Sequence, residues 1–267
     1  MTFSSFYSIS EAKLRDLPES LAIEAERIAN LYLKTTEEAK KEKITKDWKE
    51  YFKGQRRTVR YLHRIGVAQF LDLKSQKNRR FSVFIASGTN TEDHAMCDSS
   101  KGVIIIYDDS CRFLPKDKLV SVIYHEIVHG LQQHKTYSKK YEKMLQDPTL
   151  SNSPEAWAQY HKQPIEFDAF TEEIALHVRK HFNKLKEDVN KSLFPYTKKK
   201  TEEALNNFLL ELELFIQSPL DNYLVFKELP LPLPFQTFVG FLKDIYKSPK
   251  HWKKFKTKMI NLLQQLK

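Results

Sequence analysis

The sequence predicts a mainly helical α+β protein with a small β-sheet. Apolar residues recur at helical spacing through most of its 267 residues. Two runs rich in β-branched and aromatic residues, 81–87 and 103–107, break that pattern and predict two strands joined by a long loop. Only 6 glycines occur, and neither glycine-rich phosphate-binding motif is present, which disfavours nucleotide-binding folds.

The predicted elements divide the chain into three regions. Residues 1–80 are predicted to be a helical N-terminal region, in which a capping-box pattern at Ser8 starts the first helix and a second helical stretch covers residues 46–73. Residues 81–182 contain the two strands and the helices that follow them, and they are the predicted catalytic core. Residues 183–267 are predicted to be a helical C-terminal region.

Proline and serine set most of the later helix boundaries. Pro115 opens a helix that runs to about His134, because a proline at the first helical position loses no hydrogen bond. Ser153 is expected to cap a further helix, and Pro164 to begin one that continues to about Phe182. The remaining predicted elements are a helix at 199–217, a proline-rich segment at 229–234 and two terminal helices.

The chain carries a formal net charge of +10. Two basic clusters, at residues 53–80 and 247–258, lie beside aromatic residues and can therefore bind nucleic acid. Solvated helix faces are the more common use of such lysine-rich segments. The two cysteines, Cys97 and Cys111, are too few for a disulfide framework, and no signal peptide is recognisable, so a cytoplasmic location is expected. No apolar stretch is long enough to span a bilayer, so no membrane partner is expected.

The strongest chemical signal is the motif H-E-x-x-H at His125, Glu126 and His129, inside the helix that Pro115 opens. Histidines four residues apart share one helix face, so both imidazoles can reach a single cation while Glu126 lies on the adjacent side. Apolar residues surround the motif, and burying three polar groups without partners is costly. The motif therefore predicts a Zn²⁺ site in which Glu126 is the catalytic base.

The segment YHEIVHGLQQH resembles the active-site helix of the zincin superfamily of zinc metallopeptidases. This resemblance implies a small sheet before the helix, which residues 81–107 would supply. The metzincin branch has H-E-x-x-H-x-x-G-x-x-H, whereas here Gln132 stands at the glycine position and Lys135 at that of the third histidine. The sequence is more similar to the gluzincin branch, which implies that a downstream helix supplies a glutamate as third ligand.

Helical phase distinguishes the downstream carboxylates. On the helix begun by Pro164, Glu166 lies in the middle of the apolar arc, and Asp168 lies on the other side. The segment PIEFDA also resembles the gluzincin ligand pattern E-x-x-A or E-x-x-D. Glu166 is therefore the predicted third ligand, and Asp168, which stands immediately before an alanine, is the alternative.

Three further residues are candidates for supporting roles. Glu173 and His177 recur along the same helix face as Glu166, where they can orient ligands or stabilise an oxyanion. A Glu–His pair at this spacing can equally fill a polar seam between helices. Tyr160 is a further candidate for the oxyanion role.

These residues predict a zinc-dependent metallopeptidase that hydrolyses peptide bonds in a protein or peptide substrate. His125, His129 and Glu166 would hold Zn²⁺, and Glu126 would take a proton from the attacking water. Two alternatives remain open. One is a protease that the basic clusters deliver to nucleic-acid-bound proteins, and the other is a structural or interaction protein that a zinc site stabilises without turnover.

Overall fold

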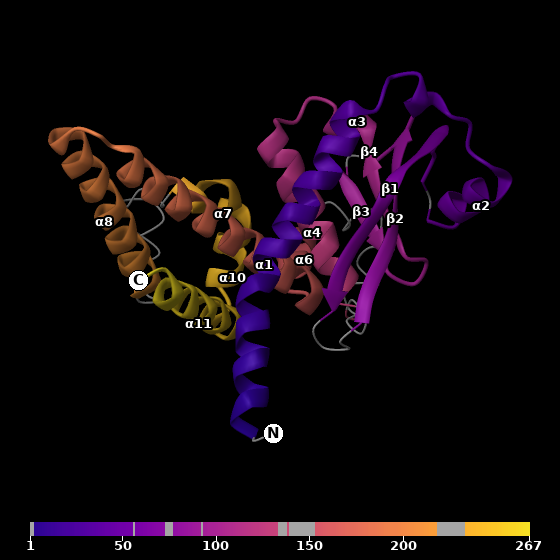
Figure 1. The fold of residues 1–267 in the computed structure, drawn as a ribbon. Coiled ribbons are helices and arrows are strands. Elements are labelled where there is room, and N and C mark those ends of the chain that lie inside the picture. The colour runs from indigo at the N-terminus through magenta and orange to yellow at the C-terminus, as the bar shows by residue number, and fades with distance from the viewer. Residues whose placement is uncertain are drawn as a thin grey trace. The chain divides into compact units, whose positions relative to one another are not determined.

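The structure is a computed structural model that describes residues 3–55, 57–72, 77–91, 93–132, 138, 153–217 and 233–267 (Figure 1). Most of the described residues are helical, and the described residues also contain four strands that form one mixed sheet. The predicted α+β class is therefore confirmed. By its internal contacts the chain comprises two compact units, Met1–His134 and Lys135–Lys267. The predicted boundaries near residues 80 and 182 stay predictions.

The sheet of the first unit has the strand order β1-β2-β4-β3 (Figure 1). Strands β1 (Tyr61–Asp72) and β2 (Lys77–Ser87) form an antiparallel pair. Strand β4 (Val103–Tyr107) runs parallel to β2, and the short β3 (Ala95–Asp98) pairs antiparallel with the other side of β4. All residues of β4 are buried, while β1 and β3 form the two edges of the sheet.

The prediction of a helix over residues 46–73 is wrong beyond its first part. Helix α2 covers only Lys46–Gly54, and β1 follows it. In β1, Ala68 and Phe70 are buried and Gln69 between them is exposed. This alternation of burial with a period of two residues is typical of a strand with one buried face. A register shift between Arg64 and Gly66 interrupts the alternation, so the apolar positions of this strand do not follow a simple period in the sequence.

The two predicted strands are confirmed, but two others were not predicted. Strand β2 begins at Lys77 rather than at residue 81, and β3 lies within the predicted loop between the two strands. The four residues of β3 are all half-buried, so they present neither the apolar run nor the alternation by which a strand is recognised.

Each face of β4 belongs to a different part of the core. Val103, Ile105 and Tyr107 pack with Phe52 of α2 and with β1 and β2 residues. Ile104 and Ile106 alternate with them and are fully buried on the other face, because successive side chains of a strand point to opposite sides. The strand is thus buried on both sides, which accounts for its continuous apolar sequence.

Two helices of the first unit pack against each other and against the sheet: α1 (Phe3–Lys34) and α4 (Lys116–Leu131) (Figure 1). Side chains of α1 also cover the outer edge of β1. Arg27 donates a hydrogen bond to the carbonyl of Val67, and the backbone N–H of Gln69 donates to the Glu24 carboxylate at 2.7 Å. These contacts satisfy backbone groups that an edge strand would otherwise expose. The short helical turns of this unit are η1 (Ala39–Lys41) and α3 (Asp108–Cys111).

A buried polar contact joins α1 to the residue that follows β4. The Tyr32 hydroxyl donates to Asp108 Oδ1 at 2.6 Å, and Lys40 Nζ lies 2.9 Å from the same oxygen. Lys40 and Asp108 are 7% and 3% exposed, so the pair is shielded from water. Burial and the neighbouring carboxylate raise the pKa of the Tyr32 hydroxyl.

We expect Asp108→Ala to lower the free energy of unfolding of the first unit by about 3 kcal/mol, because it leaves the buried Lys40 ammonium without its buried partner. Glu37 remains as the other partner of Lys40, which keeps the loss at the lower end of the usual range. Urea unfolding measures this difference. Asp93→Ala, which removes a carboxylate that is 52% exposed from its ion pair with Arg57, is the control and should cost less than about 1 kcal/mol. Equal losses in the two variants would contradict the expectation.

The second unit is helical throughout its described residues. It contains α6 (Pro154–His161), α7 (Pro164–Lys191), α8 (Pro195–Gln217), η2 (Leu233–Phe238), α10 (Val239–Tyr246) and α11 (Pro249–Leu266). Ser153 caps α6 as predicted, since its Oγ accepts a hydrogen bond from the N–H of Ala156 at 3.1 Å. Pro164 begins α7 as predicted, although the helix continues to Lys191 rather than ending near residue 182. Of the proline-rich segment, residues 229–232 lie outside the described residues.

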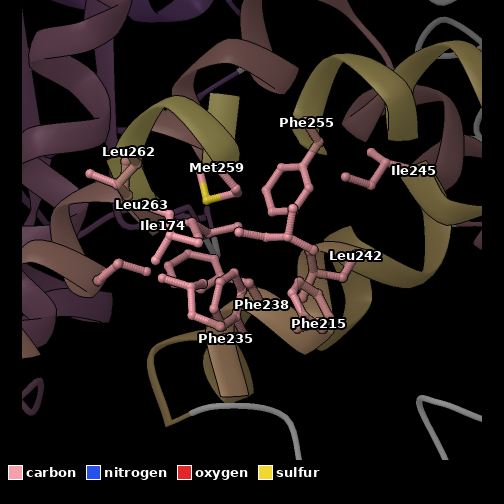
Figure 2. Close-up of a cluster of buried hydrophobic side chains, with 14 of the residues drawn as sticks. Ile174, Phe215, Phe235, Phe238, Leu242, Ile245, Phe255, Met259, Leu262 and Leu263 are labelled. Atoms are coloured by element: carbon pink, nitrogen blue, oxygen red, sulfur yellow. The ribbon is translucent and has the colours of Figure 1, made fainter. Parts of the chain in front are cut away.

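The core of this unit is rich in aromatic side chains from α7, α8, η2, α10 and α11 (Figure 2). Trp252 and Phe255 stack with their ring centroids 5.6 Å apart, and both are almost fully buried. The predicted C-terminal helices are therefore confirmed as α8, α10 and α11. None of the described helices is both long and apolar enough to cross a membrane.

Candidate metal centre

The two histidines of the H-E-x-x-H motif lie on α4, one turn apart. Their ring centroids are 4.6 Å apart, and the rings are nearly perpendicular. His125 is 8% exposed and His129 is half-buried. Because α4 begins directly after Pro115 and continues through both residues, the predicted helical context of the motif is confirmed.

Gln132 lies next to His129 at the end of α4. Its Oε1 is 3.1 Å from Nδ1 of His129, and a carbonyl oxygen can only accept, so Nδ1 donates. The proton is then on Nδ1, and Nε2 keeps the lone pair with which an imidazole binds a metal. In the sequence, Gln132 stands out only as a departure from the metzincin motif. Its i+3 spacing from His129 is the signal that could have identified it as the orienting residue.

Glu126 lies on α4 beside the histidines and is 9% exposed. Its charge affects groups on neighbouring elements of the first unit. Burial raises the pKa of the Cys111 thiol to about 12, and the Glu126 carboxylate contributes to that rise. Burial also raises the pKa of the Cys97 thiol on β3, with Glu126 the next largest cause. Glu126 is therefore within electrostatic range of the edge strand β3. Both cysteines are free thiols that form no disulfide.

Gly130 allows α4 to lie close to the sheet. A Cβ at this position would be 3.0 Å from Cζ of Phe70 and 3.1 Å from Cζ of Phe81, which is closer than carbon atoms normally approach. The two rings stack with their centroids 5.3 Å apart, so they cannot both move away easily.

We therefore expect Gly130→Val to lower the free energy of unfolding by about 2 kcal/mol, since added methyl groups would overpack this contact. Gly240→Val is the matched control, because Gly240 is exposed on α10 and a Cβ there would meet nothing within 4 Å. Thermal unfolding of both variants measures the difference. If the Gly130→Val protein were as stable as the Gly240→Val protein, the rings of Phe70 and Phe81 would have moved to accommodate the side chain, and the expectation would be contradicted.

Helix α7 separates its carboxylates into two groups. Glu166 and Glu173 are 0% and 5% exposed, whereas Asp168 and Glu172 form ion pairs with Lys254 and Lys258 of α11. This is the division that the helical phase predicts for the apolar arc of α7. Asp168 has its carboxylate 2.7 Å from Lys254 Nζ, so it is committed to a partner in its own unit.

Metal-ligating atoms gather at His125, His129 and Glu166. Each offers one ligand atom, and these atoms all lie within 4.8 Å of one another. Among the residues that the structure describes, this is the group of His, Cys, Asp and Glu side chains close enough to hold an ion. Two imidazoles and one carboxylate are one of the donor sets found in catalytic zinc sites, which leave a fourth position open.

The residues predicted to support the site make contacts within their own unit. His177 has its ring edge-on to Phe238 at 5.4 Å between centroids, and Tyr160 packs edge-on against Phe170. Glu173 is buried on the same helix. Glu173 and His177 are not part of the group of gathered ligand atoms, and the supporting roles of all three residues stay predictions.

Several residues of the basic clusters are used within the fold. Arg57 pairs with Asp93 and donates to the Tyr107 hydroxyl, while Lys254 and Lys258 pair with carboxylates of α7. Arg56 and Lys74 lie outside the described residues. The intramolecular contacts favour the interpretation of these segments as helix and strand surfaces, and a nucleic-acid partner stays a prediction.

Comparisons with protein-family models, curated proteins and solved structures found no match for this chain. Its function is therefore argued from the chemistry of the site.

Proposed function

We propose that this chain is a zinc-dependent metallopeptidase with a zincin-like catalytic core. The observation that carries the proposal is the approach of His125, His129 and Glu166 to within 4.8 Å of one another, with Glu126 between the two histidines in the sequence. A purely structural site would use the same three ligands but would have no need of a buried carboxylate beside them. Glu126 thus favours hydrolysis over a stabilising role.

In the proposed hydrolysis, different residues of the chain bind the metal and transfer the proton. His125, His129 and Glu166 hold the metal, and Gln132 keeps the His129 ring in the tautomer that binds it. When bound, Zn²⁺ supplies a Lewis acid that lowers the pKa of water and polarises the scissile carbonyl group. Glu126 accepts a proton from the attacking water and then donates it to the nitrogen of the leaving amine.

An extended peptide is the substrate that the sheet best accommodates. Strand β3 lies at the edge of the sheet and packs next to α4, so its outer backbone groups are on the side of the motif helix. A peptide that pairs with this edge gains main-chain hydrogen bonds without requiring a particular sequence. Side-chain pockets, rather than the strand, would then decide the cleavage specificity.

Metal analysis combined with a cleavage assay tests the proposal. We expect about one zinc per chain after zinc incubation and dialysis, and sharply reduced zinc in His125→Ala and His129→Ala. His63→Ala, a half-buried histidine on β1, is the control and should leave the zinc content unchanged. Cleavage of casein or a peptide library should cease on chelation and return with added zinc.

Two results would count against the proposal. Absence of any transition metal after zinc incubation would remove the metal site. Bound zinc without cleavage of any substrate would favour the alternative of a zinc-stabilised structural or interaction protein.

A further inference from the structure

The α7–α8 hairpin extends beyond the core of the second unit. The last buried residue of α7 is Phe182, and the first of α8 is Phe208. Residues 183–207, all of which the structure describes, include no buried residue. The two helix ends and the turn between them therefore form an arm that adds little apolar burial to the fold (Figure 1).

The tip of this arm exposes large apolar side chains. Leu193, Phe194 and Tyr196 are 90%, 72% and 70% exposed. The turn itself is held by hydrogen bonds, since Ser192 Oγ donates to the carbonyl of Asp188 at 2.8 Å and lies 3.4 Å from Thr201 Oγ1. A structured turn that presents adjacent apolar residues to water indicates a surface that another apolar phase covers.

Positive charge surrounds the tip. Residues 189–201 contain four lysines, at 191, 198, 199 and 200, and the nearest acidic residues, Glu187, Asp188, Glu202 and Glu203, flank this stretch. Lys191 pairs with Glu187 at the end of α7, and Lys200 lies over the Tyr196 ring with its Nζ 4.8 Å from the centroid. The other lysines are exposed in the first turns of α8, where the helix dipole disfavours positive charge.

We propose that the tip of the α7–α8 hairpin docks on the surface of an anionic lipid bilayer. Leu193 and Phe194 would enter the boundary between headgroups and acyl chains, and the lysines of α8 would lie at the level of the negative headgroups. Leu193, the most exposed of the three apolar residues, is aliphatic and offers no ring for a base to stack on, so nucleic acid would account for only part of the patch. The expectation of no membrane partner rested on the lack of a spanning segment, and a docking tip requires none.

Co-sedimentation of the full chain with vesicles tests this proposal. We expect binding to vesicles of phosphatidylcholine with about one third phosphatidylserine, weakening as salt is added, and little binding to phosphatidylcholine alone. The double variant Leu193→Ser, Phe194→Ser and the triple variant Lys198→Gln, Lys199→Gln, Lys200→Gln should each weaken binding at least about tenfold. The charge-matched control changes Lys46, Lys49 and Lys53, which are exposed on α2, to glutamine and should retain binding.

Insertion of the tip into the bilayer is measured separately, by quenching of tryptophan fluorescence. Tryptophan in a Phe194→Trp variant should be quenched by brominated lipids, whereas tryptophan in Phe113→Trp, at an 86% exposed site in the first unit, should not. No vesicle binding, or an equal loss in the α2 control, would overturn the proposal. Binding of the tip to poly(U) or to a protein in place of vesicles would overturn it as well. None of these results depends on the metal site, so the proposed peptidase activity is tested separately.

Discussion

Replacing Glu126 with glutamine should abolish hydrolysis while leaving zinc bound. Glutamine has nearly the same shape as glutamate, but its amide cannot accept a proton from water. Loss of a positioned general base typically lowers the rate by about 10²- to 10⁴-fold, and we expect a loss in this range. Turnover of a casein or peptide substrate, measured together with zinc content, tests the prediction.

The control for this variant is Asp117→Asn, which alters an exposed carboxylate in the first turn of the same helix. It should retain full activity and the same zinc content. Undiminished turnover in Glu126→Gln would remove Glu126 from the role of base. Loss of zinc in that variant would instead show that the carboxylate contributes to holding the metal.

Glu166→Ala should weaken zinc binding far more than Asp168→Ala. Removing a residue that orients a ligand typically costs about 10- to 100-fold in affinity, so removing the ligand itself should cost more than about 100-fold. Asp168→Ala removes an ion pair with Lys254, whose side chain is 60% exposed, and the metal should be unaffected. Competition with a chromogenic chelator measures both affinities.

A second substitution guards against misfolding of the Glu166 variant. Glu166 is fully buried, so alanine leaves a cavity that can destabilise α7 independently of any metal. Glu166→Gln keeps the volume and removes the charge, and it should also weaken zinc binding while its circular dichroism remains that of the parent. If Asp168→Ala lost zinc and Glu166→Gln kept it, the third ligand would have to be reassigned.

Several helices can be predicted from a local signal at their start, although the capping-box pattern at Ser8 is wrong in this respect, since α1 already begins at Phe3. Pro115, Ser153 and Pro164 each begin or cap a helix in the structure, and each does so through a property of its own backbone or hydroxyl. The helical phase of α7 likewise separates Glu166 from Asp168, because it depends only on the residue spacing. The motif helix and its candidate ligands can therefore be recognised from residue types and spacing alone.

Strands are predicted less well, because their conformation depends on pairing and packing with segments that are distant in the sequence. Strand β1 carries a register shift and lies on the edge of the sheet, where its pairing with β2 and its cover by α1 decide its conformation. Strand β3 has four half-buried residues, and its pairing with the distant β4 rather than a local pattern marks it as a strand. The role of Gln132 was not predicted either. In the comparison with the metzincin motif, Gln132 is only a residue that replaces the glycine, whereas in the structure it contacts His129.

The contact of Tyr32 with Asp108 bears on how the first unit folds. It joins residues 76 apart in the sequence, and α1 also packs on α4, which is made later still. During synthesis the apolar face of α1 leaves the ribosome well before the strands and the helix that cover it. Contacts between distant segments also slow folding, because the chain loses loop entropy before they form. We therefore expect this unit to refold slowly for its size, with the nascent α1 as the segment most in need of a chaperone.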